Sequence, residues 1–102
     1  MADFVTRAVE RLRSDPGFSR NRHYLALSSP EGRRALRIHR HLRSLERDLE
    51  RGCAATVGRD AERIRLVLRG KRSSRVAYLT RAEFRLLCTS PIVRAALGAA
   101  AD

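Results

Sequence analysis

The sequence is poor in several residue types that mark particular protein classes. It has two cysteines, Cys53 and Cys88, no tryptophan, and one lysine, Lys71, among 22 Lys and Arg residues. Two cysteines are too few for a disulfide framework, so we expect free, buried thiols in a reducing compartment. No apolar run approaches the roughly 18 residues of a membrane-spanning helix, and no apolar signal region opens the chain. We therefore expect a soluble cytoplasmic protein that does not bind a membrane.

Motifs for catalysis and metal binding are also missing. The sequence has no phosphate-binding glycine loop, zinc-protease motif or nucleophile elbow. His39 and His41 are two positions apart, whereas a metal pair on a helix needs a spacing of three or four. An RNA-cleaving enzyme would draw on His23, Tyr24 and Tyr78, but such enzymes carry a multi-strand sheet and only two strands are predicted. We expect no enzyme, no cofactor and no metal.

The sequence has a large excess of positively charged over negatively charged residues. The 102 residues carry a formal net charge of +11 and are 43% hydrophobic. This composition predicts a folded chain whose field favours nucleic acid, an anionic membrane or an acidic protein surface. A codon bias explains the choice of arginine over lysine, but it explains the excess of bases over acids less well.

Apolar spacing predicts helices in the first half of the chain. One amphipathic helix is expected over residues 3–13 with Asp3 as its cap, and a short helix or turn over 18–27. The next helix is long. It begins at the capping pair Ser29-Pro30 and ends at Arg51-Gly52, where the glycine is the C-cap.

The middle of the chain predicts a hairpin. Residues 53–61 are expected to form a loop. Alternating apolar residues then predict strands over 62–69 and 75–79, and residues 70–74 connect them as an antiparallel pair.

Two more helices are expected after the hairpin. Thr80 and Glu83 form a capping box at the start of helix 80–88, and Ser90-Pro91 begins the last helix. No repeat or linker divides the sequence. We therefore predict one compact basic α+β domain, residues 1–102, mostly helical with about four to five helices and one antiparallel β-hairpin. A helix with a basic hairpin has the outline of a winged helix, by analogy of fold alone.

The segments RIRLVLRG and VAYLTRAEFRLL, within residues 63–87, resemble the start of the OmpR/PhoB-type winged-helix effector domain. In that family two strands lead into an LTxxEFxLL helix. Two further helices and a terminal hairpin follow there and carry DNA recognition, whereas 15 residues remain after this stretch. We therefore carry over neither function nor contact residues from the resemblance.

The long helix sorts its residues onto two sides. Its apolar side consists of Ala35, Ile38, Leu42, Leu45 and Leu49. Its reverse is a row of arginines, Arg33, Arg37, Arg40, Arg47 and Arg51. Two interpretations of this row are open. Its guanidinium groups, each a planar set of hydrogen-bond donors, contact a phosphate backbone, or the row is an ordinary solvated helix face. Glu46 and Glu50 are expected on the flank, paired with Arg43 and Arg47.

A second basic cluster covers residues 69–75 and includes the only lysine. It either contacts phosphates through its cations and serines or is polar because hairpin turns are exposed.

Together the two clusters predict a small nucleic-acid-binding protein, a DNA-binding regulator or accessory factor, with DNA favoured over RNA. The expected contacts are Arg33, Arg34, Arg37, Arg40, Arg43, Arg69, Lys71, Arg72 and Arg75. Arg34 and Arg43, beside the row, are the candidates for reading sequence. The alternative is an interaction module that binds an acidic protein or forms a homodimer through the 35–49 apolar stripe. Attachment to anionic lipid through the first helix ranks lower, because that helix lacks tryptophan and a dense lysine face.

Overall fold

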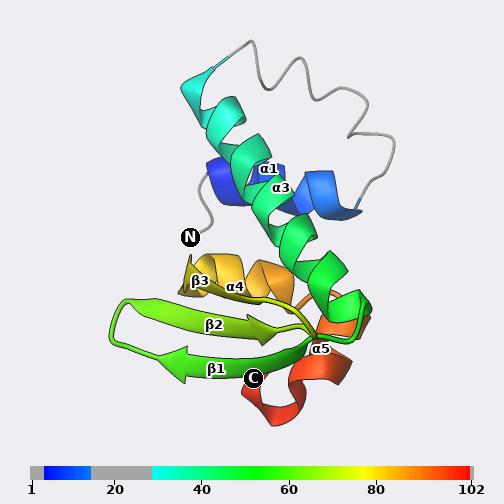
Figure 1. Cartoon of the computed structure of the whole chain (residues 1–102). Helices are drawn as coiled ribbons and strands as arrows, with labels where there is room; N and C mark the ends of the chain where they lie inside the picture. The colour runs from blue at the N-terminus through cyan, green and yellow to red at the C-terminus, as the bar shows by residue number, and fades with distance from the viewer. Residues whose placement is uncertain (1–3, 15–28, 102) are drawn as a thin grey trace. The chain divides into compact units, whose positions relative to one another are not determined.

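The computed structural model of the chain describes residues 4–14 and 29–101. In these residues the fold is α+β, with four α-helices, a three-stranded antiparallel sheet and a final 3-10 turn (Figure 1). The elements are α1 (Phe4–Ser14), α3 (Pro30–Glu50), β1 (Ala54–Arg59), β2 (Arg63–Arg69), β3 (Ser74–Thr80), α4 (Arg81–Leu87), α5 (Pro91–Leu97) and η2 (Gly98–Ala101).

The chain divides into two compact units, residues 1–42 and 43–102, and helix α3 runs through the division. The prediction of a single domain over 1–102 stays a prediction. The expected Asp3 cap and the expected short helix over 18–27 lie outside the described residues.

The first unit contains α1 and the amino-terminal half of α3. All of the described residues Phe4–Ser14 are helical, which agrees with the helix predicted over 3–13, and α1 buries Val5, Ala8, Val9 and Leu12. These positions recur at the three- and four-residue spacing that places side chains on one helix face. In the same unit, α3 buries Ala35 and Leu36. The amphipathic pattern of the first helix is therefore confirmed.

Both predicted ends of α3 are confirmed. At its start, the Ser29 hydroxyl accepts a hydrogen bond of 3.0 Å from the N–H of Gly32, and Pro30 is the first helical residue. At its end, Gly52 has a φ of +89°, which a residue with a side chain rarely adopts. The N–H of Gly52 donates to the Leu49 carbonyl at 3.0 Å, and the N–H of Cys53 donates to the Asp48 carbonyl at 3.2 Å. This is a Schellman motif, which turns the chain sharply into β1.

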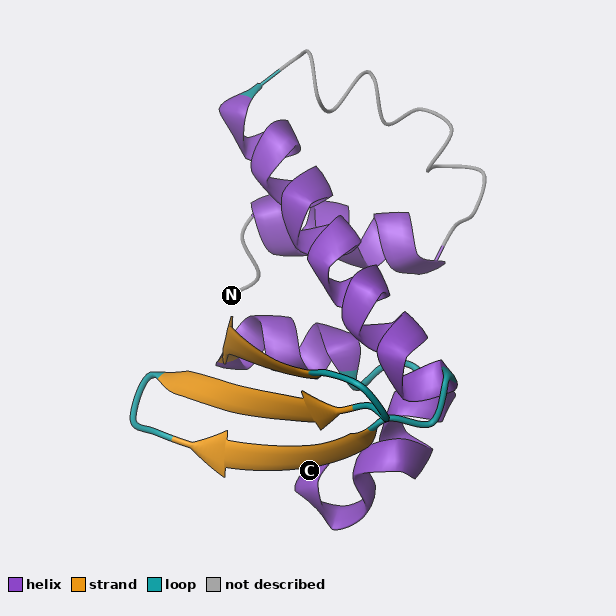
Figure 2. Ribbon diagram, viewed as in Figure 1, coloured by secondary structure: helices purple, strands orange, loops and turns teal. Residues whose placement is uncertain are grey.

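The sheet corrects the predicted hairpin. It has three strands in the order β1-β2-β3, with both pairs antiparallel and β2 in the middle (Figure 2). The expected loop over 53–61 contains strand β1, which pairs with β2 along its whole length. The prediction missed β1 because Val57 is its only large apolar residue and Gly58 interrupts its alternation. The strands predicted at 62–69 and 75–79 are confirmed as β2 and β3.

One face of the sheet is buried against helices. Its buried residues include Ile64, Leu66, Leu68, Ala77 and Leu79. Helix α4 contacts β2 and β3, and α5 contacts β1. The other face remains open to solvent, because burial alternates along β2 and β3.

The predicted capping box at the start of α4 is confirmed. The N–H of Glu83 donates to the Thr80 hydroxyl at 3.1 Å, and the Thr80 N–H donates to the Glu83 carboxylate at 2.8 Å. Pro91 begins α5 as predicted, although Ser90 makes no side-chain capping bond. Within the described ranges no single helix is long and apolar enough to cross a membrane. The bent pair Arg81–Leu87 and Pro91–Ala101 reaches that length and composition only when taken together.

Candidate nucleic-acid interface

The predicted contact residues fall in both units. Arg33, Arg34, Arg37 and Arg40 lie on the part of α3 in the first unit, and all four are exposed. In the second unit lie Arg43, Arg69, Lys71, Arg72 and Arg75. The residues of this second set have two different environments. Arg43 and Arg75 bind acidic side chains of the second unit, whereas Arg69, Lys71 and Arg72 are exposed to solvent.

The two-sided sorting of α3 is confirmed. Ala35, Leu42 and Leu45 are 0% exposed, and Leu49 is 4% exposed. Ile38 is only half-buried. The arginine row on the reverse is exposed along its length, at Arg33, Arg37, Arg40, Arg47 and Arg51. Because the apolar stripe is already covered within one chain, the exposed chemistry of this helix is its row of guanidinium groups.

Arg43 is held by the acids of its own helix. Its Nη1 lies 2.6 Å from Oε2 of Glu46 and 3.7 Å from Oε1 of Glu50. The predicted pairing of Glu46 with Arg43 is confirmed, and the Glu46 residue is 6% exposed. Charge neutralisation by Arg43 makes this burial tolerable, because an unpaired buried carboxylate is costly.

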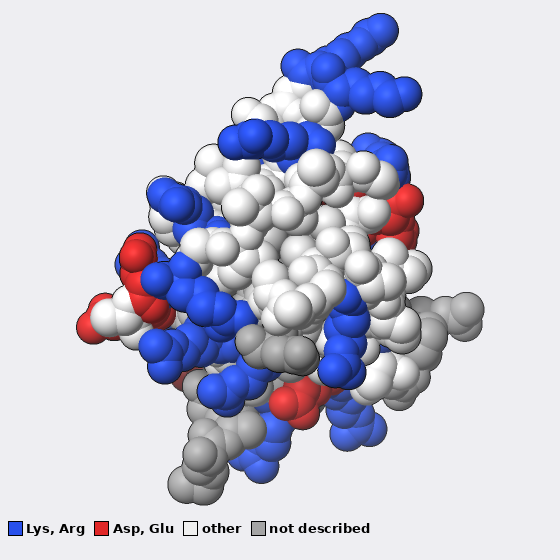
Figure 3. Space-filling view, turned by 90° about the horizontal axis from the view of Figure 1, so that it is seen from below, with Lys and Arg blue, Asp and Glu red and all other residues white. Residues whose placement is uncertain are grey.

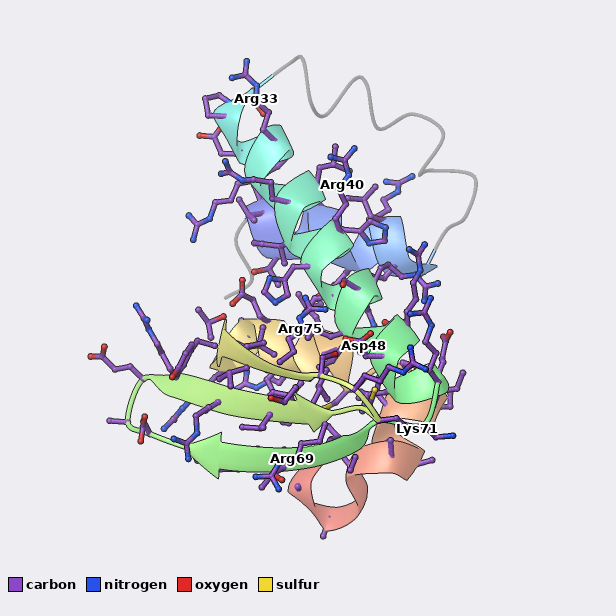
Figure 4. All side chains as sticks on the ribbon, viewed as in Figure 1. Arg33, Arg40, Asp48, Arg69, Lys71 and Arg75 are labelled. Atoms are coloured by element: carbon purple, nitrogen blue, oxygen red, sulfur yellow. The ribbon has the colours of Figure 1, made fainter. Side chains whose placement is uncertain are left out.

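Arg75 reaches from β3 to α3. Its Nη1 donates to the Ser44 hydroxyl at 2.7 Å and to the Asp48 carboxylate at 3.1 Å. Figure 4 shows Arg75 and Asp48 pointing toward each other between the sheet and the helix. Although the sequence placed Arg75 among the phosphate contacts, here its guanidinium ties two elements of the second unit together.

The turn between β2 and β3 lies beside the end of α3. The N–H of Gly70 donates to the Ser73 carbonyl at 2.9 Å, which closes the turn. A methyl group on Gly70 would lie 3.6 Å from the sulfur of Cys53, the last residue of the Schellman motif. The last turn of α3 and the β2–β3 turn are therefore neighbours.

We call the cations at this junction the basic end. Its members are Arg47, Arg51, Arg69, Lys71 and Arg72. All five are exposed. Sequence reasoning placed Arg47 and Arg51 in the arginine row but did not choose them as contacts. The sequence did not predict strand β1. The pairing of its Ala54 with Arg69 brings the end of α3 beside the β2–β3 turn.

The acids nearest the basic end are paired elsewhere. Glu46 and Glu50 face Arg43, and Asp48 faces Arg75. Within residues 29–101, no ion pair engages Arg47 or Arg51. In the space-filling view of Figure 3, Lys and Arg side chains project at many places and outnumber the visible Asp and Glu side chains. The basic end therefore retains its positive charge for an external anion.

The remaining candidates are the cysteines, histidines and tyrosines considered for metal binding or catalysis. That part has no group of three or more His, Cys, Asp and Glu residues able to hold a metal ion. Cys88 is buried and Cys53 is half-buried, and neither forms a disulfide within the described residues. Tyr78 projects from the open face of the sheet, whereas His23 and Tyr24 lie outside the described residues.

Comparison with protein-family models, curated proteins and solved structures found no match for this chain.

The Arg75–Asp48 contact gives a stability prediction. In a double-mutant cycle of Arg75→Ala and Asp48→Ala, we expect a coupling energy of about 0.5–1 kcal/mol, because both groups are partly exposed and solvent weakens their attraction. Urea unfolding of the two single variants and the double variant measures it. The pair Arg47→Ala and Asp48→Ala is the control and should show no coupling. Equal coupling in both cycles contradicts the assigned contact.

Proposed function

We propose that this protein binds nucleic acid through phosphate contacts at the basic end, as a DNA-binding regulator or accessory factor. The observation that carries the proposal is the junction of α3 with the β2–β3 turn. There, two basic segments that are distant in sequence become neighbours, at the approach of Gly70 to Cys53. The nearby acids are engaged by Arg43 and Arg75.

The chemistry of the basic end suits a phosphate backbone. Arginine offers a planar fork of donors, and Lys71 adds a compact charge at the exposed turn. Ser73 and Ser74 are exposed beside it and can donate hydroxyl hydrogen bonds to phosphate oxygens. Arg47 lies in the last turn of α3, and the N–H of Arg51, directly after the helix, donates to the Arg47 carbonyl at 3.0 Å, so the two residues are about one helical turn apart.

The arginines of the first unit extend the proposal. Arg33, Arg34, Arg37 and Arg40 are exposed and remain proposed contacts. The proposal does not require a winged-helix arrangement, which stays a prediction from the helix and the basic turn. DNA is preferred over RNA as in the sequence interpretation.

The alternative is a protein-interaction module acting on an acidic partner or a second copy. A homodimer through the 35–49 stripe is less favoured, because Leu42, Leu45 and Leu49 are buried within one chain. A second copy that pairs on this stripe has to displace what already covers it.

Equilibrium binding at low salt tests the proposed function. Fluorescence anisotropy with a labelled 20-base-pair duplex at about 50 mM salt should show saturable binding with a micromolar or tighter Kd. Light scattering on the same sample reports the oligomeric state. A tight oligomer that binds neither duplex nor single strand at this salt overturns the proposal and favours the interaction module.

A further inference from the structure

The open face of the sheet carries its own arrangement of side chains. In the strand register, Gly58 faces Arg65 and Arg65 faces Tyr78, so the three residues form one row across the sheet. Neighbouring strands lie about 4.8 Å apart, and directly opposed residues share a face. Tyr78 is 57% exposed, and Val76, two residues earlier on the same face of β3, is 50% exposed, so this face offers adjacent apolar surface.

The absence of a side chain at Gly58 leaves room for the side chain of Arg65. A methyl group on Gly58 would lie 3.2 Å from Nη2, 3.3 Å from Nε and 3.6 Å from Cζ of Arg65. The Nε–Nη2 edge of the Arg65 guanidinium therefore lies closest to the space above Gly58, which a side chain on β1 would crowd. Among the described residues no hydrogen bond or ion pair engages it. The row therefore presents an exposed cation on one side and an exposed ring on the other.

The next row toward the basic end is mainly apolar. It consists of Thr56, Val67 and Val76, and Val76 is 50% exposed. Two rows that offer an exposed aromatic ring, an exposed guanidinium and an exposed valine suit the faces of unpaired nucleobases, which stack on aromatic rings and guanidinium planes.

Charge on the open face has one sign. Arg63, Arg65 and Arg69 project from β2 on this face, and none of the residues that share the face on β1 and β3 is acidic. Arg69 also belongs to the basic end, so the open face and the basic end are continuous. The acids Asp60 and Glu62 lie beyond the opposite end of β2, which disfavours phosphate there.

We propose that the open sheet face is a platform for unpaired bases, on which Tyr78 stacks one base and Arg65 a neighbouring one, so that the preferred ligand is single-stranded nucleic acid. This inference rests on the proposed function. The phosphates of the strand follow Arg63 and Arg69 toward the basic end. In a duplex the bases are stacked on each other, so the platform adds affinity only for an unpaired strand.

Comparing the affinity for a single strand with the affinity for a duplex distinguishes the base platform on the open face from phosphate binding at the basic end. The probes are a labelled 12-nucleotide single strand of mixed sequence and the duplex of the same sequence, titrated at about 50 mM salt. Tyr78→Ala should lower single-strand affinity on the order of 10-fold or more, since stacking on an aromatic ring contributes about 1–3 kcal/mol per base. Duplex affinity should change less than twofold. Tyr78→Phe keeps the ring and should bind as wild type, and Ile92→Ala, at a 48% exposed position on α5 away from the open face, is the matched exposed control.

Tyrosine emission gives a readout that does not depend on truncation. The chain has two tyrosines and no tryptophan, so Tyr24→Phe leaves Tyr78 as the sole intrinsic fluorophore of its class. Saturation with the single strand should quench this emission strongly, and saturation with the duplex should not. If both probes bind but quenching is absent and Tyr78→Ala binds the single strand as wild type, the platform is wrong while the proposed function stands. If neither probe binds wild type, the proposed function itself fails.

Discussion

Reversing the charge of the β2–β3 turn should nearly abolish nucleic-acid binding. We expect Lys71→Glu/Arg72→Glu to lower affinity for a 20-base-pair duplex on the order of 100-fold at low salt. Both side chains are exposed at the junction with α3. Hydrogen bonds to charged groups contribute about 1.5–3 kcal/mol each, and the new acids also repel phosphate. Fluorescence anisotropy measures the loss, and circular dichroism checks that the fold is retained.

Two further double variants make this result specific. Arg7→Glu/Arg85→Glu changes the net charge by the same amount at exposed positions on α1 and α4. It should weaken binding only a few-fold, through the long-range field. Arg34→Glu/Arg37→Glu tests the contacts that the sequence favoured in the first unit. A larger loss there than at the turn would move the main contact to the amino-terminal half of α3.

The second large effect concerns stability. Leu66→Ala should lower the free energy of unfolding by about 2–5 kcal/mol, because Leu66 is 0% exposed on the central strand and truncation leaves a cavity. A chain of this size has a total stability of roughly 5–15 kcal/mol, so much of the population could unfold near body temperature. Urea unfolding followed by circular dichroism gives the value.

Val76→Ala is the matched control for Leu66→Ala. Val76 lies on the neighbouring strand but on the open face, where it is 50% exposed. Its truncation should cost about 0.5 kcal/mol or less. Similar losses in the two variants would mean that the sheet does not have one buried and one open face.

Most helix boundaries were predictable because their signals are local. Ser29-Pro30, Gly52 and the Thr80 capping box each act within a few residues, and all three have the predicted geometry. Strand β1 carries no comparable local signal. It forms because β2 offers it a partner, which is a tertiary effect that alternation within AATVGR does not report.

The candidate site was less predictable for the same reason. That Arg43 and Arg75 bind acids within the second unit depends on where the elements pack, since Arg75 and Asp48 are 27 residues apart in sequence. The approach of Cys53, at the end of α3, to Gly70 in the β2–β3 turn depends on the unpredicted strand. By contrast, the exposure of the arginine row followed from helical spacing alone, because burying the apolar stripe turns the opposite face outward.

The salt dependence of duplex binding tests the central claim most directly. Each phosphate neutralised on B-DNA contributes about −0.9 to the slope of log K against log salt concentration. Five contacts at the basic end predict a slope of about −4 to −5 for wild type, and a slope lower in magnitude by about two for Lys71→Glu/Arg72→Glu. A slope near zero, or one that is the same in both proteins, would contradict phosphate binding at the basic end.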